Sequence, residues 1–305
     1  MRSIITTVAL VTLAAVTGAS IAGSPAPVEP DAEDLDPSRV AALEYLETEV
    51  LLALGITPAG VADIGGYRQW VGIQSEALGD SRDLGSRQSP SLESLADLEP
   101  TLIVSSHWRH GNIAQRLTSI GPTLLYADLP QPEATDQYSR MQAIVRDLGQ
   151  RLGRQAQAQQ ALTALDEQLA SQRSRLRDSG ADGAIVLAQH VQGSQRFRLF
   201  TDNSLAIRIA RELGLSNGFE HAPQPHGFAT VRLEDMLALP QDSHLLIVAD
   251  RDDAAYQRLT DSRLWQSVPG VETERLIHLP TDTWFFGGPL SARRLADRIT
   301  DGLLD

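Results

Sequence analysis

Residues 154–176 contain neither glycine nor proline and consist largely of good helix formers. Short apolar runs alternate with amphipathic stretches on both sides of this segment, and Ser179-Gly180 is suited to end a helix. One long helix between two such regions acts as a strut, because it offers no flexible loop as a hinge. We therefore expect an α/β protein with two α/β lobes joined by a single long backbone helix, and little closure around a ligand. The apolar face of this helix is predicted from Leu152, Ala156, Leu162, Leu165 and Leu169.

The first region begins as strand, helix and strand. Residues 39–43 form a short apolar run, and leucines at helical spacing follow over 46–54. Gly55 lies where a helix C-terminus favours a positive φ, and Pro58 prevents continuation. The next segment, Gly65-Gly66-Tyr67-Arg68-Gln69-Trp70, has the character of an exposed loop. Since open α/β folds bind ligands at the carboxyl ends of their strands, this loop is expected to place an aromatic ring at that edge.

Further helices and strands are predicted from capping residues and apolar runs. In the first lobe, Ser89 is expected to cap a helix that starts at Pro90. In the second lobe, a helix is expected over residues 204–213 with Gly214 as its stop, and the last helix is expected to start at Leu290. The predicted strands span residues 102–104, 123–126, 184–187, 197–200, 245–248 and 276–279.

The N-terminus has the pattern of a secretory signal peptide. Arg2 precedes an apolar stretch over residues 4–16, and small residues suit cleavage after Ala19 or Ala22. A membrane anchor is the alternative, but the stretch contains threonines and is shorter than the roughly 20 residues that span a bilayer. We expect a signal peptide over 1–22, a flexible arm over 23–37, an N-terminal α/β lobe over 38–132, a connecting helical segment over 133–179 and a C-terminal α/β lobe over 180–305.

Composition narrows the location and the partners. The chain has no cysteine, which excludes a lipoprotein attachment site, disulfides, thiolate metal sites and a cysteine nucleophile. This favours a free periplasmic protein over a lipid-tethered one. The formal net charge is −13 at pH 7, and loss of Arg2 with the signal peptide would make it −14. So acidic a chain argues against nucleic acid as a partner, because nucleic-acid binding needs a basic face.

Two short segments resemble each other and precede strands in corresponding places. Residues 91–95 come before the strand at 102–104, and residues 232–236 come before the strand at 245–248. If Ser89 and Thr230 are the N-caps, Glu93 and Glu234 are each the fourth residue of a helix. The two lobes would then present matched carboxylates.

The amino-acid sequences of several segments are similar to those of a known protein family. Residues 39–70, 83–98 and 232–250, together with Trp284-Phe285-Phe286-Gly287, resemble periplasmic ferric-hydroxamate siderophore-binding proteins, the ferrichrome-receptor branch of the iron-siderophore substrate-binding family. The resemblance implies a monomer that captures a ferric siderophore in the cleft between its lobes and delivers it to an inner-membrane ABC permease and its ATPase. It implies no catalysis and no cofactor, since the siderophore itself holds the iron.

The resemblance also implies a set of ligand-binding residues. Arg87 matches an arginine that contacts iron-bound hydroxamate oxygens, for which a guanidinium can donate two parallel hydrogen bonds. The alternative for Arg87 is a solvated surface residue. Aromatic side chains are expected to pack on the methylene arms of the siderophore, whereas Trp265 is expected in the core. The predicted ligand-binding residues are Trp70, Arg87, Trp108, His110, His226, Trp284 and Phe286, with the two histidines standing where relatives carry a tyrosine and a tryptophan.

By the same resemblance, Glu93 and Glu234 correspond to acidic residues that the two permease subunits recognise, one on each lobe. The alternative is structural, because a glutamate in the first turn of a helix is favoured by the helix dipole alone.

Three other classes of function remain as alternatives. Histidine pairs at 107/110 and 221/226 raise the possibility of a metal site, but no carboxylate lies at matching spacing, so no metal site is predicted. Haem, held by a histidine or by Tyr67, or a corrinoid would suit the same scaffold. Gly79-Asp80-Ser81 is similar to the nucleophile block of small esterases, yet no aspartate lies three residues before His278 and no Gly-x-Ser-x-Gly elbow occurs.

Overall fold

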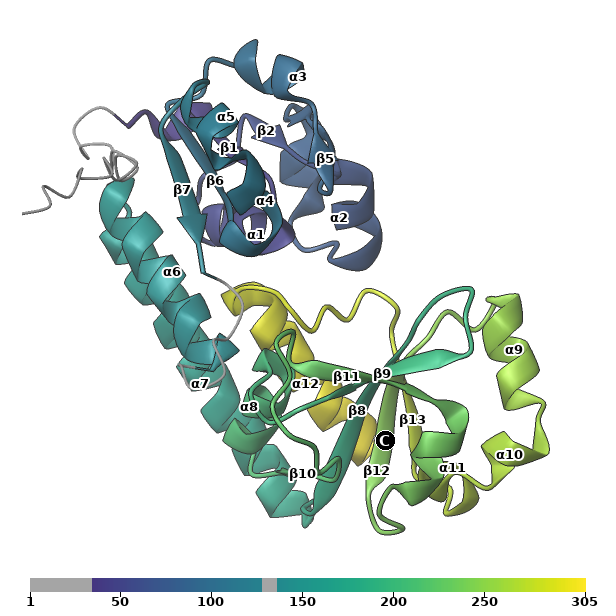
Figure 1. The fold of residues 1–305 in the computed structure, drawn as a ribbon. Helices are drawn as coiled ribbons and strands as arrows, with labels where there is room; N and C mark the ends of the chain where they lie inside the picture. Colours follow the sequence, from purple (N-terminus) through teal and green to yellow (C-terminus); the bar gives the residue numbers. More distant parts are fainter. Residues whose placement is uncertain (1–34, 128–135) are drawn as a thin grey trace, which may run out of the picture.

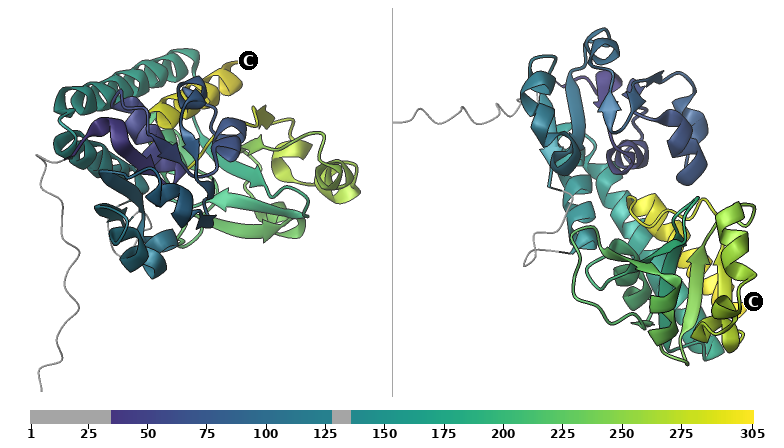
Figure 2. Two further views of the ribbon diagram at one scale, coloured as in Figure 1. Left: turned by 90° about the horizontal axis from the view of Figure 1, so that it is seen from above. Right: turned by 45° about the vertical axis from the view of Figure 1, so that its right-hand side comes forward.

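The computed structural model describes residues 35–127 and 136–305, which form two lobes at the two ends of a helical backbone (Figure 1). Each lobe is built on its own β-sheet. Figure 2 shows from two further sides that the backbone helices run along one side of both lobes. The predicted signal peptide and most of the predicted arm lie outside the described residues. In the described ranges, no helix has both the length and the apolar character that crossing a membrane requires.

The first lobe contains a five-stranded parallel sheet in the order β3-β2-β1-β6-β7. Successive side chains of β1 point to opposite faces, so Val40 and Ala42 pack toward the helical backbone and Ala41 packs toward the other side. Burial on both faces explains why these strands read as unbroken apolar runs. The elements of this lobe are η2 (Pro37–Arg39), β1 (Val40–Ala42), α1 (Tyr45–Ala53), β2 (Gly60–Val61), α2 (Ile64–Trp70), η3 (Ser75–Gly79), β3 (Arg82–Asp83), β4 (Gly85–Ser86), β5 (Ser89–Pro90), α3 (Leu92–Ala96), β6 (Leu102–Ser106), α4 (His107–His110), η4 (Gly111–Ile113), α5 (Ala114–Thr118) and β7 (Thr123–Tyr126).

The second lobe contains a six-stranded mixed sheet in the order β11-β9-β8-β12-β13, with β10 paired to β8. Strand β9 runs antiparallel to both β8 and β11, whereas β12 and β13 continue the sheet in parallel. Trp265 is buried in the core on one face of this sheet, as predicted. The elements of this lobe are β8 (Ala184–His190), β9 (Arg196–Phe200), α8 (Leu205–Glu212), β10 (Ser216–Asn217), β11 (Phe228–Arg232), η5 (Leu233–Ala238), β12 (His244–Val248), α9 (Ala254–Thr260), α10 (Arg263–Gln266), α11 (Pro269–Glu272), β13 (Leu276–Leu279) and α12 (Pro289–Leu304).

The connecting segment holds two helices, α6 (Gln137–Arg151) and α7 (Gln155–Ser179), which pack against each other. The long helix predicted over residues 154–176 is present as α7, and Gly180 with φ +72° ends it. Gly153, with φ +65°, separates α7 from α6. A Cβ on Gly149 would lie 2.6 Å from that of Ala158, so a glycine is needed where the two helices approach.

A single apolar cluster runs through the backbone from one lobe to the other. It contains Val40 of β1, Leu165 of α7 and Leu187 of β8. Three predicted positions of the α7 face are buried, but Ala156 is exposed and Ala158 takes its place. Because this cluster is shared, the two lobes are not independent bodies on a flexible linker.

Residues 64–70 differ from the sequence-based prediction of an exposed loop, because they form helix α2. Asp63 adopts a left-handed conformation (φ 61°) and its carboxylate accepts a hydrogen bond from the Gly66 backbone N–H, which caps the helix. Tyr67 is completely buried and donates from its hydroxyl to the Ile73 carbonyl. The Tyr67 ring is thus part of the core, whereas Trp70, the predicted ligand-binding ring of this segment, is only partly buried at the end of α2.

The predicted N-caps Ser89 and Thr230 are also wrong. Ser89 belongs to a short hairpin in which β5 pairs with β4, and Ser91 caps α3 by accepting from the Ser94 N–H. In the second lobe, η5 begins after Arg232. Glu93 and Glu234 therefore each occupy the second helical position and not the fourth, so their placement in the two lobes still matches.

Candidate ligand-binding site

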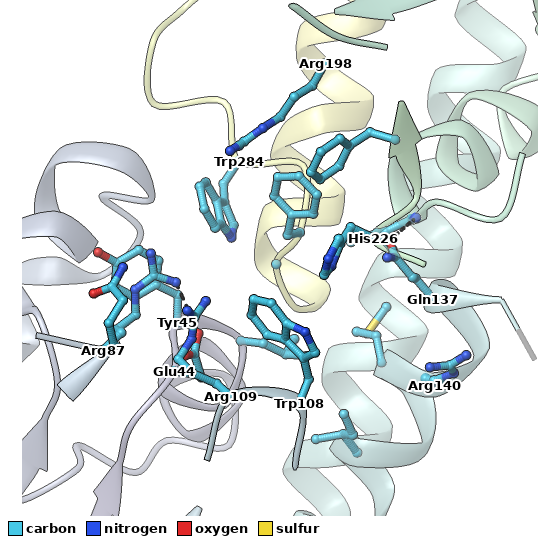
Figure 3. A pocket seen from close by; sticks show the side chains of 18 residues that line it. Glu44, Tyr45, Arg87, Trp108, Arg109, Gln137, Arg140, Arg198, His226 and Trp284 are labelled. Carbon is cyan, nitrogen blue, oxygen red and sulfur yellow. Dashed lines mark hydrogen bonds and ion pairs between the residues drawn. The ribbon is translucent and has the colours of Figure 1, made fainter. Parts of the chain in front are cut away.

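A cavity of about 470 Å³ lies between the two lobes and against α6 (Figure 3). Both lobes and the backbone helix α6 contribute to its wall, in which guanidinium groups, aromatic rings and aliphatic chains are joined by a carboxylate, two amides and an imidazole. The lining residues are Glu44, Tyr45, Leu46, Arg87, Gln88, Trp108 and Arg109 from the first lobe, Gln137, Arg140, Met141 and Ile144 from α6, and Arg198, Leu205, His226, Phe228, Trp284, Phe286 and Gly287 from the second lobe.

The first-lobe residues follow the carboxyl ends of parallel strands. Glu44 and Tyr45 lie two and three residues after the end of β1, and Trp108 lies two residues after the end of β6. Arg87 lies at the tip of the β4–β5 hairpin, which follows β3. These ends meet at one edge of the sheet, which is where open α/β folds bind ligands. The sheet topology thus brings together residues that are far apart in the sequence.

Arg87 is held in place by an ionic cluster. Its Nη1 donates to Glu44 Oε2 at 3.1 Å, and its Nε lies 3.6 Å from Asp63 Oδ2. Its guanidinium carbon lies 3.6 Å from the centre of the Tyr45 ring, and the Tyr45 hydroxyl donates to Asp63 Oδ2 at 2.5 Å. Arg109 forms an ion pair with the other oxygen of Glu44. Burial raises the pKa of the Glu44 carboxyl, although Arg87 and Arg109 oppose this shift.

His110 does not line the cavity, contrary to the sequence-based expectation. Its side chain is 1% exposed, with Nε2 2.8 Å from the Arg87 carbonyl oxygen and Nδ1 2.6 Å from Ser105 Oγ. Because a carbonyl oxygen can only accept, Nε2 carries the hydrogen and Nδ1 accepts from the Ser105 hydroxyl. Burial lowers the pKa of His110, which keeps the ring neutral. This histidine therefore positions the backbone of Arg87 from behind.

The predicted aromatic residues lie at different depths. Trp284 is in the cavity wall, edge-on to Tyr45 at 5.6 Å and to Phe286 at 5.2 Å between ring centres. Trp108 is 51% exposed at the mouth, where its ring meets that of His226 across the two lobes at 4.9 Å. Trp70 lies outside the main cavity. It lines a neighbouring cavity of about 220 Å³, which shares Arg87, Arg198 and Trp284 with the main one.

The second lobe contributes a charged residue that sequence reasoning missed. Arg198 lies within β9, where its Nη1 donates to Gln189 Oε1 at 3.1 Å. Its guanidinium carbon lies 4.8 Å from the centre of the Phe228 ring, which also stacks on His226. Burial lowers the pKa of Arg198, yet a guanidinium stays protonated at neutral pH.

Some of the missed residues carried a usable signal. Glu44 and Tyr45 follow a predicted strand directly, so the rule that ligands bind at strand ends points to them. Arg198 interrupts the apolar run of its strand, which marks a side chain that is not in the core. The cavity residues of α6 recur at 137, 140, 141 and 144, a helical stripe that indicates a buried face but not a ligand.

Other chemistries find little support in the described part of the chain. Among these residues no group of three or more histidines, aspartates or glutamates is arranged to hold a metal ion. In the segment that is similar to an esterase nucleophile block, Gly79 and Asp80 are exposed and the Ser81 hydroxyl donates to the Pro58 carbonyl. Tyr67, a candidate haem ligand, is buried away from the cavity wall.

Comparison with known proteins identifies relatives along nearly the whole chain. The family model described as periplasmic binding protein matches residues 40–283. The iron(3+)-hydroxamate-binding protein FhuD of Escherichia coli (strain K12) is 31% identical over 273 residues, which cover 88% of this chain and 88% of FhuD. The Fe(3+) dicitrate-binding periplasmic protein FecB of the same strain is 26% identical, over 85% of this chain and 83% of FecB.

Comparison with solved structures leads to the same group of proteins. The siderophore-binding protein FhuD from Vibrio cholerae, bound to Fe³⁺-Desferal, superposes with a TM-score of 0.79 over 88% of this chain and 98% of its own, at 26% identity. The predicted fold class is thereby confirmed.

Proposed function

The chain belongs to the periplasmic binding protein family, and we propose that it captures a ferric siderophore of the hydroxamate type and delivers it to an inner-membrane ABC importer. The family consists of substrate-binding proteins and not of enzymes. The observation that carries the proposal is the cavity between the lobes, which is lined by Arg87, held in place by Glu44, and by the aromatic rings of Trp284 and Phe286.

The chemistry of such a cavity suits the outside of an iron complex. A siderophore that fills the coordination sphere of iron leaves no position for a protein ligand, so recognition falls to the periphery of the complex. Arg87 can donate to negatively charged hydroxamate oxygens without losing its proton. Aromatic rings can pack on the methylene arms. On this proposal Trp108, His226, Trp284 and Phe286 contact the ligand, Trp70 contacts it from the neighbouring cavity, and His110 acts through Arg87.

The proposal includes delivery to a partner. Glu93 and Glu234 are both exposed, each at the second position of a short helix, one in each lobe. We assign them to docking on the two permease subunits. Carboxylates on both lobes would fix the orientation of the binding protein through complementary charge.

The remaining assignments are also proposals. We place the mature protein in the periplasm as a monomer, released by cleavage of a signal peptide over residues 1–22 and not tethered as a lipoprotein. We take residues 38–132 and 180–305 as the two lobes, with residues 133–179 as the connecting segment. The siderophore is the ligand, and no further cofactor is required.

A fluorescence titration tests the ligand class. The mature protein is titrated with ferrichrome, ferrioxamine B and a ferric coprogen. Separate titrations with haem and with a corrinoid test the two alternative ligand classes. We expect the ferric hydroxamates to quench tryptophan fluorescence, because Trp284 and Trp108 would lie beside an absorbing ferric centre. Binding of haem or a corrinoid without binding of any ferric hydroxamate would show that the proposal is wrong.

A further inference from the structure

The positive charges of the cavity are balanced unequally between the two lobes. In the first lobe, Arg87 and Arg109 are paired with Glu44, and Arg87 also lies beside Asp63. Two guanidinium groups and two carboxylates thus offset each other there. In the second lobe, Arg198 has no carboxylate oxygen within 4.0 Å among residues 35–127 and 136–305; its partner is the neutral amide oxygen of Gln189.

The Arg198 side chain is also placed to meet a ligand. It is partly buried and lines both the main and the neighbouring cavity, beside Trp284 in each (Figure 3). The side-chain oxygen of Gln189 accepts a hydrogen bond from one N–H group of Arg198, and the Phe228 ring lies near the guanidinium carbon. A guanidinium has five N–H donors, so most remain for a ligand. Because Gln189 and Phe228 already restrict the Arg198 side chain, it loses less conformational entropy when a ligand binds.

A partly buried cation without a counter-charge is unfavourable unless something compensates for its lost hydration. A carboxylate supplies a full negative charge and matches the planar donor fork of arginine. The hydroxamate oxygens of a ferric complex carry only part of a charge each, because iron shares it. The surface of the chain is strongly acidic, so an anionic ligand needs a local positive group in the cavity.

We propose that Arg198 binds a carboxylate on the periphery of the ferric siderophore, so that the protein prefers hydroxamate complexes that bear a carboxylate over neutral or cationic ones. This inference rests on the proposed function. It makes Arg198 a specificity-determining residue, which acts from the lobe opposite Arg87. The alternative is that Arg198 only packs on Phe228 and Gln189, in which case it would not discriminate between ligands by charge.

A charge series on one iron-binding core separates these two roles. The three probes are ferrioxamine B, which has a free ammonium group, and its N-acetyl and N-succinyl derivatives, which are neutral and anionic at that end. Dissociation constants are measured by tryptophan quenching at low and at high salt. We expect affinity to rise from ammonium to acetyl to succinyl, with about tenfold between the last two, as for a hydrogen-bonded charge pair, and a smaller difference at high salt.

Substitution identifies the residue responsible. In Arg198→Gln the preference for the succinyl complex should disappear while the affinity for the acetyl complex stays within about threefold. Arg198→Lys should keep the order of the series with a reduced preference, because it retains the charge but not the fork. Arg196→Gln is the matched control, since Arg196 is exposed on the same strand and outside both cavities, and it should leave the series unchanged.

The outcomes distinguish this inference from the proposed function. If the wild-type protein binds the three complexes equally, the inference is wrong and the function stands. If the preference survives in Arg198→Gln, the assignment to Arg198 is wrong. If none of the three complexes binds, the hydroxamate function itself fails, and the inference fails with it.

Discussion

At the residue scale, Arg87 is fixed before any ligand arrives. Glu44 and Asp63 hold its guanidinium, Tyr45 lies beneath it, and His110 holds its carbonyl. These partners come from segments that follow three different strands of one sheet. A guanidinium fixed in this way loses little further freedom on binding, which is the usual benefit of a preorganised site.

Replacement of Arg87 tests its role directly. Arg87→Ala should weaken binding of a ferric hydroxamate by about 1.5–3 kcal/mol, the range for hydrogen bonds to charged groups. Arg87→Lys should restore part of this loss, because lysine keeps the charge without the planar fork. Dissociation constants from fluorescence quenching measure both effects. Arg68→Ala, which changes an exposed arginine of α2, serves as the control. An unchanged dissociation constant in Arg87→Ala would show that Arg87 does not contact the ligand.

His110 should make stability depend on pH. Burial holds its pKa below the ordinary value of 6.5, so below about pH 6.5 the unfolded chain binds a proton that the folded chain does not. Its contribution is therefore fully present above pH 6.5 and is lost as the pH falls below that value. In His110→Gln, whose amide can still donate to Arg87 and accept from Ser105, this part of the decline should be absent.

Urea unfolding of both proteins between pH 7.5 and pH 5 measures the difference, with pH values chosen to span the ordinary pKa of histidine of about 6.5. The comparison with the variant is needed because burial also lowers the pKa of His244 and of His278, and both remain in His110→Gln. Parallel stability curves for the two proteins would contradict the neutral buried state of His110.

The sequence could indicate which segments form the site but not which way each side chain points. Arg87, Trp284 and Phe286 were predicted from segments that resemble a family, and all three line the cavity. His110 lies four residues after the end of β6, in a segment where a ligand-binding residue is expected, but the short α4 turns it inward against Ser105. That direction depends on the three-dimensional path of four residues. No periodicity or spacing in the sequence encodes it.

At the element scale, the start of α12 depends on a residue of the other lobe. Glu49 of α1 is completely buried and accepts from the Ser291 N–H at 2.7 Å and from the Ser291 hydroxyl at 2.5 Å. It thus caps a helix whose own N-cap residue, Gly288, has no side chain to do so. Burial raises the pKa of the Glu49 carboxyl, and the hydrogen bonds from the helix end oppose this shift.

The two glycines before α12 leave the space that this contact needs. A Cβ on Gly287 would overlap both the Glu49 carboxylate and the Ser291 side chain. Gly287→Ala should therefore destabilise the protein by about 1–3 kcal/mol, the usual cost of overpacking. Thermal or urea unfolding measures it. Gly65→Ala is the matched control, because a Cβ there meets no atom within 4 Å, and it should be neutral or slightly stabilising. Equal stability of the two variants would contradict the tight interlobe contact.

Most elements were predictable because their signals are local. Strand β7 and the stop of α1 at Gly55 follow from apolar runs and from a single glycine. The division of the connecting segment into α6 and α7 was missed, since helix formers continue on both sides of Gly153 and no proline marks the turn. The position of α2 was missed because Asp63 reaches its capping conformation through contacts with Tyr45 and Gly66.

At the scale of the whole molecule, the lobes are joined by more than α7. The shared apolar cluster passes through the backbone, and Glu49 binds the start of α12. Farther along α12, Arg294 donates to the Val71 carbonyl of the first lobe at 2.7 Å. A large closing motion would break these contacts. Such a molecule can present both lobes to a partner in one fixed arrangement, so two recognition residues far apart can act together.

Glu93 and Glu234 are the candidates for that recognition. A structural role is the competing explanation, because a carboxylate in the first turn of a helix gains about 0.3–1 kcal/mol from the helix dipole. The double substitution Glu93→Ala with Glu234→Ala separates the two roles. We expect the dissociation constant for ferric siderophore to stay unchanged, since neither residue lines the cavity, while stimulation of importer ATPase and siderophore uptake fall sharply. Glu76→Ala with Glu220→Ala removes the same number of exposed charges and is the control. If uptake survives the first double substitution, the carboxylates only support their helices, and the importer must dock on another surface.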